Sequence, residues 1–380
     1  MIKQIFLGSA IAASFIFTGC GGGSTSTAQS ESLTTGYFVD SAVSNLNYDC
    51  VADNVLNKTT ASNGEFQCKN MSQVRFRINN LILGEISQLP DDGYVFPQDL
   101  VGVSREDVYD ENVTAIARVL QMCDKDHNVT NGVEISDDIL ADFNTSETLT
   151  VDNVDNYLTR IRARNGNFDI NATEAQKHLH GTVQDIDSKR VADLNISTLP
   201  ISELSNDTLE TINYMLNEEK LAHDLYISLY ELYPNLFQLQ NIAERSETKH
   251  ENLVSQLADK YGVENDSNLS VGEFGLSEIN GLYDTLYDLG KNSAVDALKV
   301  GCMVEVTDIN DLDTDIAIAQ EDGALDVLTV FTSLRDGSYN HYWAFNKALI
   351  NQGIEEGCRS AGEEYYHPEY PQNTNPRSMQ

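Results

Sequence analysis

Four long segments of the chain have the apolar periodicity of amphipathic helices, and the connections between them differ in length. The segments cover residues 205–233, 236–261, 293–309 and 323–352. Only a tight turn at Pro234 separates the first two, whereas residues 262–292 separate the second from the third. Antiparallel neighbours need only short links, but a parallel pair of helices needs a long crossover. The order therefore predicts a four-helix bundle with one long crossover, between its second and third helices, over residues 205–355.

Acidic and histidine residues recur on these four segments, at positions that would meet inside such a bundle. They are Glu219 on the first segment, Glu247 and His250 on the second, Glu305 and Asp308 on the third, and His341 on the fourth. Dinuclear carboxylate proteins of this architecture take a Glu from each of two helices and a Glu-x-x-His pair from each of the others. Burying each carboxylate costs several kcal/mol unless a cation offsets its charge. The pattern predicts a centre for iron or manganese, metals that accept carboxylate and imidazole ligands.

Four sequence blocks carry a more specific resemblance. EEKLAHDLY, NIAERSETKH, DALKVGCMVEVTDINDL and GSYNHYWAF occur in this order within residues 205–350. Together they resemble a bacterial and archaeal family of ferritin-like domains of unknown function that is related in fold to rubrerythrin. The resemblance implies Glu219, Glu247, His250, Glu305 and His341 as ligands of a di-iron or iron/manganese centre, with Asp308 as an additional carboxylate. It also implies oxidation of Fe(II) or reduction of peroxide or O₂, with a separate electron donor for a peroxidase, and a possible homodimer.

One position departs from the family pattern. Ser338 stands three residues before His341, where the fourth helix should carry a Glu, and the adjacent Gly337 favours a local bulge. The centre would then lack one bridging carboxylate unless Asp308 replaces it. The alternative is a non-enzymatic envelope scaffold or adhesin whose bundle holds no metal. Glu218, one residue before Glu219, is expected on the solvated side of its helix.

The N-terminus has the pattern of a secretory signal. A basic start and a short apolar run end at Phe17-Thr18-Gly19-Cys20, which resembles a bacterial lipobox. Residues 1–19 would be removed, Cys20 would carry the lipid anchor, and residues 20–35 would form a flexible tether. Gly21 after the cysteine indicates the outer membrane. We therefore expect a lipid-anchored protein of the cell envelope.

Between the tether and the bundle, two further regions are expected. Residues 36–111 alternate weakly and include an Asn63-Gly64 turn, so they predict a small all-β, sandwich-like module. Residues 112–204 are polar and mostly helical, and predict a linker region; residues 356–380 form a tail. Cys50 and Cys68 flank one hairpin-like stretch and predict a disulfide in an oxidising compartment. Cys302 and Cys358 could pair if the fourth helix ends near the third, which leaves Cys123 unpaired.

The net charge of the chain and the acidic loop at residues 124–135 indicate which partners and ligands to expect. The chain has 59 acidic and 24 basic residues, a net charge of −35, which argues against binding nucleic acid. Asp124, Asp126, Asn128 and Thr130 occupy the first, third, fifth and seventh positions of a calcium loop. Val129 and Ile135 break that pattern at its sixth and twelfth positions. The sequence therefore allows two interpretations of this loop, a calcium site or a polar turn between helices.

Overall fold

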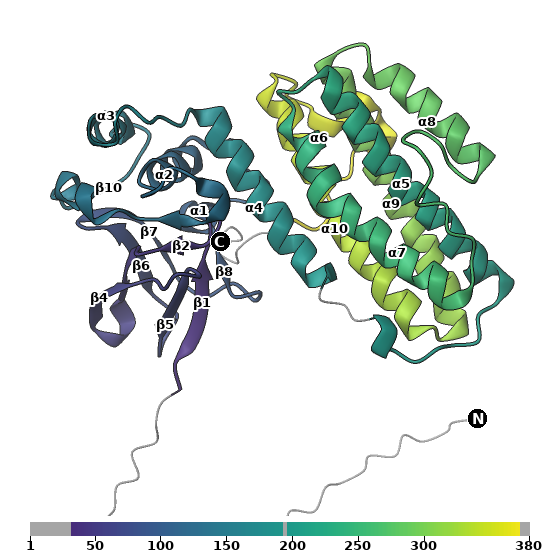
Figure 1. Ribbon diagram of the computed structural model, residues 1–380, viewed down its shortest axis with the longest axis horizontal. Helices are drawn as coiled ribbons and strands as arrows, with labels where there is room; N and C mark the ends of the chain where they lie inside the picture. The colour runs from purple at the N-terminus through teal and green to yellow at the C-terminus, as the bar shows by residue number, and fades with distance from the viewer. Residues whose placement is uncertain (1–31, 193–195, 373–380) are drawn as a thin grey trace, which may run out of the picture. The chain divides into compact units, whose positions relative to one another are not determined.

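The computed structural model describes residues 32–192 and 196–372 (Figure 1). A β-rich region is followed by a helical region, which confirms the predicted succession. The signal segment, Cys20 and the tether up to residue 31 lie outside the described residues. No helix in the described ranges combines the length and the apolar character needed to cross a membrane.

The β-rich region contains short strands in three sheets. The strands are β1 (Thr34–Phe38), β2 (Val43–Ser44), β3 (Asn47–Cys50), β4 (Val55–Thr59), β5 (Glu65–Cys68), β6 (Val74–Ile78), β7 (Leu81–Ile86), β8 (Tyr94–Val95), β9 (Val133–Glu134) and β10 (Glu147–Thr148). One sheet has the order β5-β1-β8, a second β10-β7-β6-β3-β4, and β2 pairs with β9. In β6, alternate residues Val74, Phe76 and Ile78 are buried, as expected for a strand with one face on a core.

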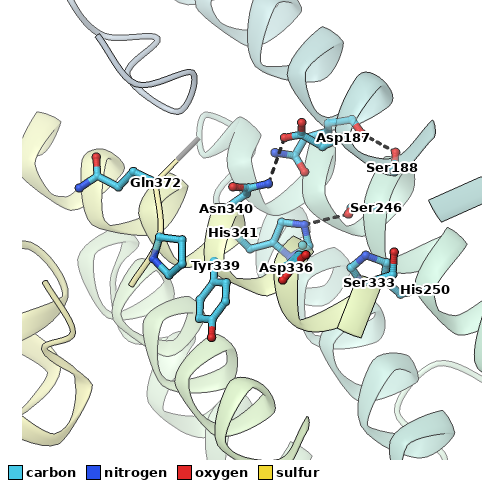
Figure 2. Close-up of a pocket in the computed structure, with 13 residues that line it drawn as sticks. Asp187, Ser188, Ser246, His250, Ser333, Asp336, Tyr339, Asn340, His341 and Gln372 are labelled. Atoms are coloured by element: carbon cyan, nitrogen blue, oxygen red, sulfur yellow. Dashed lines mark hydrogen bonds between the residues drawn. The ribbon is translucent and has the colours of Figure 1, made fainter. Parts of the chain in front are cut away.

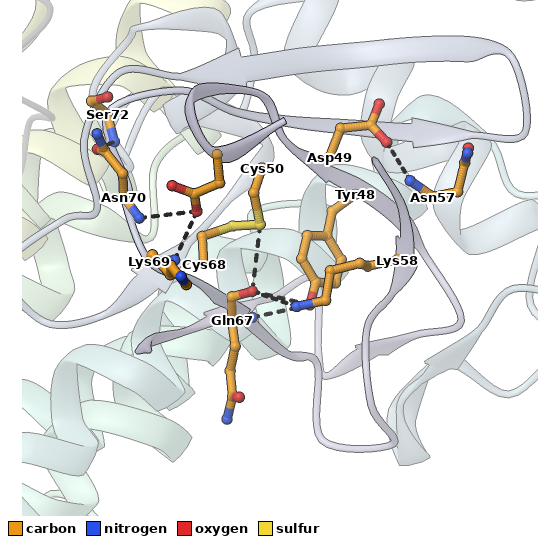
Figure 3. Close-up of a disulfide and its surroundings, with 11 residues drawn as sticks. Tyr48, Asp49, Cys50, Asn57, Lys58, Gln67, Cys68, Lys69, Asn70 and Ser72 are labelled. Atoms are coloured by element: carbon orange, nitrogen blue, oxygen red, sulfur yellow. Dashed lines mark hydrogen bonds between the residues drawn. A yellow bond between two sulfur atoms is a disulfide. The ribbon is translucent and has the colours of Figure 1, made fainter. Parts of the chain in front are cut away.

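Aromatic contacts and one disulfide join the two larger sheets. The ring of Phe76 in β6 lies 4.8 Å from that of Phe38 in β1 and 5.0 Å from that of Phe66 in β5, measured between centroids. The disulfide between Cys50 and Cys68, the predicted pair, links β3 to β5 (Figure 3). Asp53 lies beside these sulfurs, but cysteines held in a disulfide are not available as metal ligands. Among the described residues, Cys123 is the free cysteine and is buried.

Removing this disulfide should destabilise the β-rich region measurably. The bond closes a loop with a sequence separation of 18 residues, for which the chain-entropy model gives about 3 kcal/mol. We expect the Cys50→Ala/Cys68→Ala variant to lose about this much unfolding free energy in denaturant titrations followed by β-sheet circular dichroism. An unchanged midpoint in this variant would contradict the prediction.

Residues 97–192 contain helices that pack on the sheets. These helices are α1 (Pro97–Val101), α2 (Glu111–Met122), α3 (Val154–Arg164) and α4 (Ala172–Ala192). Asp110 caps α2 by accepting the backbone N–H groups of Asn112 and Val113. Ile116 in α2 and Leu179 in α4 belong to the same apolar core as the strands. The stretch expected to be a linker therefore buries apolar residues, and no break in the core falls between residues 111 and 112.

The helical region follows the predicted segments, except that the third helix continues to Asp322, past its expected end at residue 309. Its helices are α5 (Asn206–Leu232), α6 (Phe237–Asn241), the π-helical segment η5 (Ile242–Glu247), α7 (Thr248–Tyr261), α8 (Ser277–Gly290), α9 (Ala294–Asp322) and α10 (Leu325–Asn351). Ser205 and Ser293 cap α5 and α9 through side-chain hydrogen bonds, and Gly262 ends α7 with a left-handed φ of 69°. Helix α8 lies within the long connection. Helix α10 runs without a bulge through Gly337, whereas the irregular turn occurs in η5.

The long helices lie side by side (Figure 1). Helix α9 packs along α10, and α5 packs along both α7 and α9. A disulfide between Cys302 and Cys358 ties α9 to the short helix η6 (Gly357–Ala361) that follows α10. Helix α4 contacts η5, α7 and α10. The described residues from Leu33 onward form one compact unit, in which residues of α4 also reach the candidate site.

Candidate metal centre

The six residues predicted as metal ligands are all buried in the helical region. Glu219 comes from α5, Glu247 from the end of η5, His250 from α7, Glu305 and Asp308 from α9, and His341 from α10. Asp308 is the most exposed of the six, at 6 %. The apolar residues beside them on each helix face the core, and this packing turns the polar residues of the same stripe inward.

Five of the six form two groups that share Glu247. His250 Nδ1 lies 3.1 Å from Glu247 Oε2 and 3.4 Å from Glu219 Oε2. His341 Nδ1 lies 2.9 Å from Glu247 Oε1 and 3.4 Å from Glu305 Oε2. Within each group the possible ligand atoms are all within 4.8 Å of one another. Each group thus offers two carboxylates and one imidazole, and Glu247 presents one oxygen to each.

The π-helical segment η5 explains how neighbouring residues reach this site. Ser246 and Glu247, which end η5, are both buried, and so is His250 one turn later. A π-helical turn is wider than an α-helical turn and is frequent at functional sites. Ser246 Oγ lies 2.8 Å from Nε2 of His341, the ring nitrogen that faces away from Glu247 (Figure 2). This contact fixes the imidazole with its Nδ1 directed at the carboxylates.

Burial and close charges shift the titration of these groups strongly. Burial lowers the pKa of His250, but Glu219 and Glu247 outweigh it and raise the value to about 10. The pKa of His341 is likewise raised well above its usual value, despite burial, by Glu247 and Glu305. Burial raises the pKa of Glu219 and Glu305, whereas the two imidazolium groups hold that of Glu247 below its usual value. Without a metal, two protonated histidines compensate part of the negative charge.

The ligand atoms of the two groups would be satisfied more fully by metal ions than by hydrogen bonds to one another. Glu219 Oε1 and His341 Nδ1 are buried and have no hydrogen-bond partner among the described residues. His250 Nε2 also lacks one, but it lies on the side of its ring that faces Gly337. His341 Nδ1 is close to Glu247 Oε1 but lacks the geometry of a hydrogen bond. Unpaired buried polar atoms are costly, and one cation between such atoms would satisfy several at once. Mixed carboxylate and imidazole donors suit Fe(II), Mn(II) or Zn(II).

Asp308 lies beside the two groups and not within them. Ser338 Oγ donates a hydrogen bond of 2.5 Å to Asp308 Oδ2, while Asp308 Oδ1 has no partner among the described residues. Burial raises the pKa of Asp308 to about 8, against the effect of this hydrogen bond. The serine that replaces the expected Glu therefore holds the carboxylate that could compensate for it. The structure does not bring Asp308 into either ligand group.

Three residues at the site were not identified as functional from the sequence. Tyr226 donates a hydrogen bond of 2.5 Å to Glu305 Oε1, and Ser246 contacts His341. Glu218, expected on the solvated side of α5, is instead 3 % exposed. The burial of both Glu218 and Glu219 could not be inferred from the sequence, because adjacent residues of an α-helix point about 100° apart and normally lie on different faces.

A pocket of about 270 Å³ opens onto the two histidines (Figure 2). Its wall combines residues of α4, such as Ser188, with residues of α10, such as Asn340, and it reaches Gln372 near the C-terminus. His250 and His341 form part of its lining, so this side of the buried groups is accessible to small molecules.

Gly337 keeps the space that His250 needs. A Cβ atom at this position would lie 2.7 Å from His250 Cε1 and 2.8 Å from its Nε2. We expect Gly337→Ala to displace the imidazole and weaken metal binding about tenfold, while the higher helix propensity of alanine preserves folding. Gly281→Ala on α8, where nothing lies within 4 Å, is the matched control. Equal affinities of the two variants in metal titrations would contradict this role.

The candidate calcium residues lie together in the loop after α2, and their oxygens already accept hydrogen bonds within it. The two oxygens of Asp124 accept the backbone N–H groups of Asn128 and Glu134. Asp126 accepts from the backbone N–H of Asn128 and from Asn131, and Thr130 donates to the Asn128 side chain. These bonds build the polar turn that was the alternative, and calcium binding stays a prediction.

Helices that present two carboxylate–histidine groups sharing one glutamate define a candidate dinuclear metal domain. The family model described as "Uncharacterized protein domain (DUF2202)" matches residues 208–366, and the chain belongs to this family. The uncharacterized protein MJ0754 of Methanocaldococcus jannaschii is 39% identical over 172 residues, which are 45% of this chain and 90% of that protein. The crystal structure of hypothetical protein MJ0754 matches with 35% identity over 46% of this chain and 93% of that chain, at a TM-score of 0.40.

Proposed function

We propose that residues 208–366 are a ferritin-like four-helix bundle that binds two metal ions, iron or iron and manganese. The observation that carries the proposal is the pair of buried three-ligand groups that share Glu247. Each group supplies two carboxylates and one imidazole. Glu247 and His250 come from the continuous stretch of η5 and α7, and the other three ligands come from α5, α9 and α10. Together the groups supply three carboxylates and two imidazoles, one carboxylate fewer than the four Glu and two His of dinuclear carboxylate proteins, because Ser338 stands where the fourth helix would supply a Glu.

The proposed activity is oxidation of Fe(II) or reduction of peroxide or O₂. A bound iron pair would supply the electrons for such a reaction. Neighbouring side chains hold and orient the proposed ligands: Ser246 fixes the His341 ring, and the Tyr226 hydroxyl positions Glu305. The pocket above the histidines admits a small oxidant, and the apolar core around the groups limits access of bulk water. A peroxidase would need a separate electron donor, whereas in a ferroxidase Fe(II) itself is the donor.

The proposal includes an envelope location. It rests on the lipobox-like sequence that ends at Cys20, outside the described residues. A lipid at this cysteine would anchor the mature chain to the membrane, and the tether would hold the folded region away from it. A homodimer through the helical region is compatible with this arrangement.

The second candidate is an envelope scaffold or adhesin without metal. Two observations favour it: the histidines and carboxylates already lie at ion-pair distance, and Ser338 satisfies one oxygen of Asp308. A metal-free core of this kind would be compensated in part by protonated histidines. Metal stoichiometry separates the two candidates.

The test is a metal count on the chain without residues 1–20. The purified protein is stripped with a chelator, loaded with Fe(II) under anaerobic conditions, and freed of excess metal before elemental analysis. We expect about two iron ions per chain, and a change of the visible spectrum after peroxide addition. Iron near zero would favour the scaffold, and bound iron whose spectrum does not respond to peroxide would contradict the proposed chemistry.

A further inference from the structure

A second pocket, of about 940 Å³, is lined by residues of α5, α8 and α9 and by the end of α7. Its acidic lining residues are Asp207, Glu210, Glu264, Glu278, Asp311 and Asp315. No Lys, Arg or His is among its described lining residues. Its interior should therefore attract cations strongly.

Buried carboxylates continue from this pocket toward the metal centre. Asp315 lines the pocket at 8 % exposure, and its Oδ2 has no hydrogen-bond partner among the described residues. Asp311, one turn earlier on α9, lies close enough to Glu218 for the two carboxyl groups to share a proton. Glu218 Oε2 is buried and also lacks a partner in the part of the chain that the structure describes. Burial raises the pKa of Asp315 to about 7 and that of Glu218 well above its usual value, so each of these carboxyl groups keeps its proton until a cation replaces it.

The positions along two helices connect these carboxylates to the candidate ligands. On α9, Glu305, Asp308, Asp311 and Asp315 are spaced by three, three and four residues, which places them along one side of the helix. On α5, Glu218 directly precedes Glu219. The charged groups that most strongly raise the pKa of Glu218, after its burial, are Asp308, Asp311 and Glu219, and all three are acidic. These acidic residues of α9 and α5 thus extend from the pocket to the metal centre.

We propose that this acidic pocket is an entry site for divalent cations, and that Asp311, Asp315 and Glu218 pass the ion inward to Asp308 and Glu219. The inference rests on the proposed function, because it supplies the metal for that centre. These three carboxylates do not form a compact ligand group of the kind seen around Glu247. Their wider spacing suits a cation that keeps part of its water shell, and so a weak, exchanging site.

The pocket above the histidines differs in chemistry. It is lined mainly by neutral polar side chains, among them Gln184, Ser188 and Asn340. Its charged lining residues are of both signs, Asp187 and Asp336 beside the two histidines, whereas those of the second pocket are all acidic. The two pockets therefore divide the access to the centre: the one above the histidines serves a small oxidant, and the acidic one serves the cation.

The first test measures the entry site without the buried centre. In a Glu247→Ala chain, Mn(II) binding is followed by loss of the free-ion electron paramagnetic resonance signal. We expect weak Mn(II) binding to remain, and to disappear when Asp311→Asn and Asp315→Asn are added. The control adds Glu231→Gln and Asp284→Asn, which remove equal charge from exposed positions on α5 and α8. Absence of weak binding in Glu247→Ala, or its survival in the Asn variant, would overturn the entry site.

The second test measures loading of the intact centre. Co(II) uptake is followed by stopped-flow absorbance in the wild type, Asp311→Asn/Asp315→Asn and the charge-matched control. We expect at least tenfold slower uptake in the Asn variant, an unchanged final stoichiometry and a smaller dependence of the rate on salt. Rates equal to the control would overturn the route. Failure of the proposed function has another signature: the wild type would then bind no more metal than Glu247→Ala.

Discussion

Replacing Glu247 by alanine should abolish binding of both metal ions, whereas replacing either histidine should weaken one ion more than the other. Glu247 is the residue that belongs to both ligand groups, with one oxygen near each histidine. Its loss leaves each group with one carboxylate and one imidazole, too few to hold a dication against exchange with water. We expect iron to fall from about two ions per chain to near zero in the anaerobic count.

Matched variants separate loss of ligands from loss of folding. Glu244→Ala removes the same charge from an exposed position of the same π-helical segment, and should keep the full metal content. Glu247→Gln preserves the side-chain volume but not the charge, and should behave like Glu247→Ala. Circular dichroism of all variants without metal should be alike. Full iron content in Glu247→Ala would show that the shared glutamate does not organise the site.

The starts of α5 and α9 and the end of α7 could be predicted because local chemistry fixes them, whereas α9 continues to Asp322, past its expected end at residue 309. Ser205 and Ser293 supply the side-chain oxygens that the first N–H groups of α5 and α9 require, and Gly262 takes a left-handed φ that few other residues adopt. The ligand positions followed from the same periodicity, since a side chain on the apolar stripe is buried whatever its own polarity. Glu219 and Glu305 are examples.

Other features depend on packing that no local pattern records. Glu218 is buried because α9 presents Asp308 and Asp311 beside it, a juxtaposition of helices far apart in sequence. The π-helical turn at Ser246 lies in a stretch without Gly or Pro, so nothing in that stretch indicates it. Residues 112–192 look like a polar linker because many charged and amide side chains are interspersed among their apolar residues. These apolar residues, Ile116 among them, nevertheless face the strands.

Metal affinity should depend steeply on pH, because the ions must displace protons from the ligands. The pKa of His250 is raised to about 10 by its carboxylate neighbours, and that of His341 is raised well above its usual value. Both imidazoles are therefore protonated at neutral pH in the metal-free protein, and Nδ1 can bind a metal only after releasing its proton. Each proton released changes the apparent binding constant about tenfold per pH unit.

The sign follows from the raised values. Protons compete below the folded-state pKa, so affinity falls as pH falls and levels off only above about pH 10, where His250 is neutral. With at least two protons released, we expect the Co(II) binding constant to rise about 100-fold per pH unit between about pH 6 and 8. Glu219, whose pKa burial also raises, steepens the dependence where it is protonated.

Variants identify the residues that cause this dependence of the binding constant on pH. His250→Asn removes one titrating ligand, so its binding constant should vary less steeply, by about one proton, than that of the wild type. His367→Gln alters a histidine paired with Glu369 outside the ligand groups, and should leave the slope unchanged. Proton release can be counted directly from binding heats in buffers of different ionisation enthalpy. A wild-type slope near zero would mean that the histidines are neutral before the metal arrives, and that the close carboxylate–imidazole contacts are not ion pairs in solution.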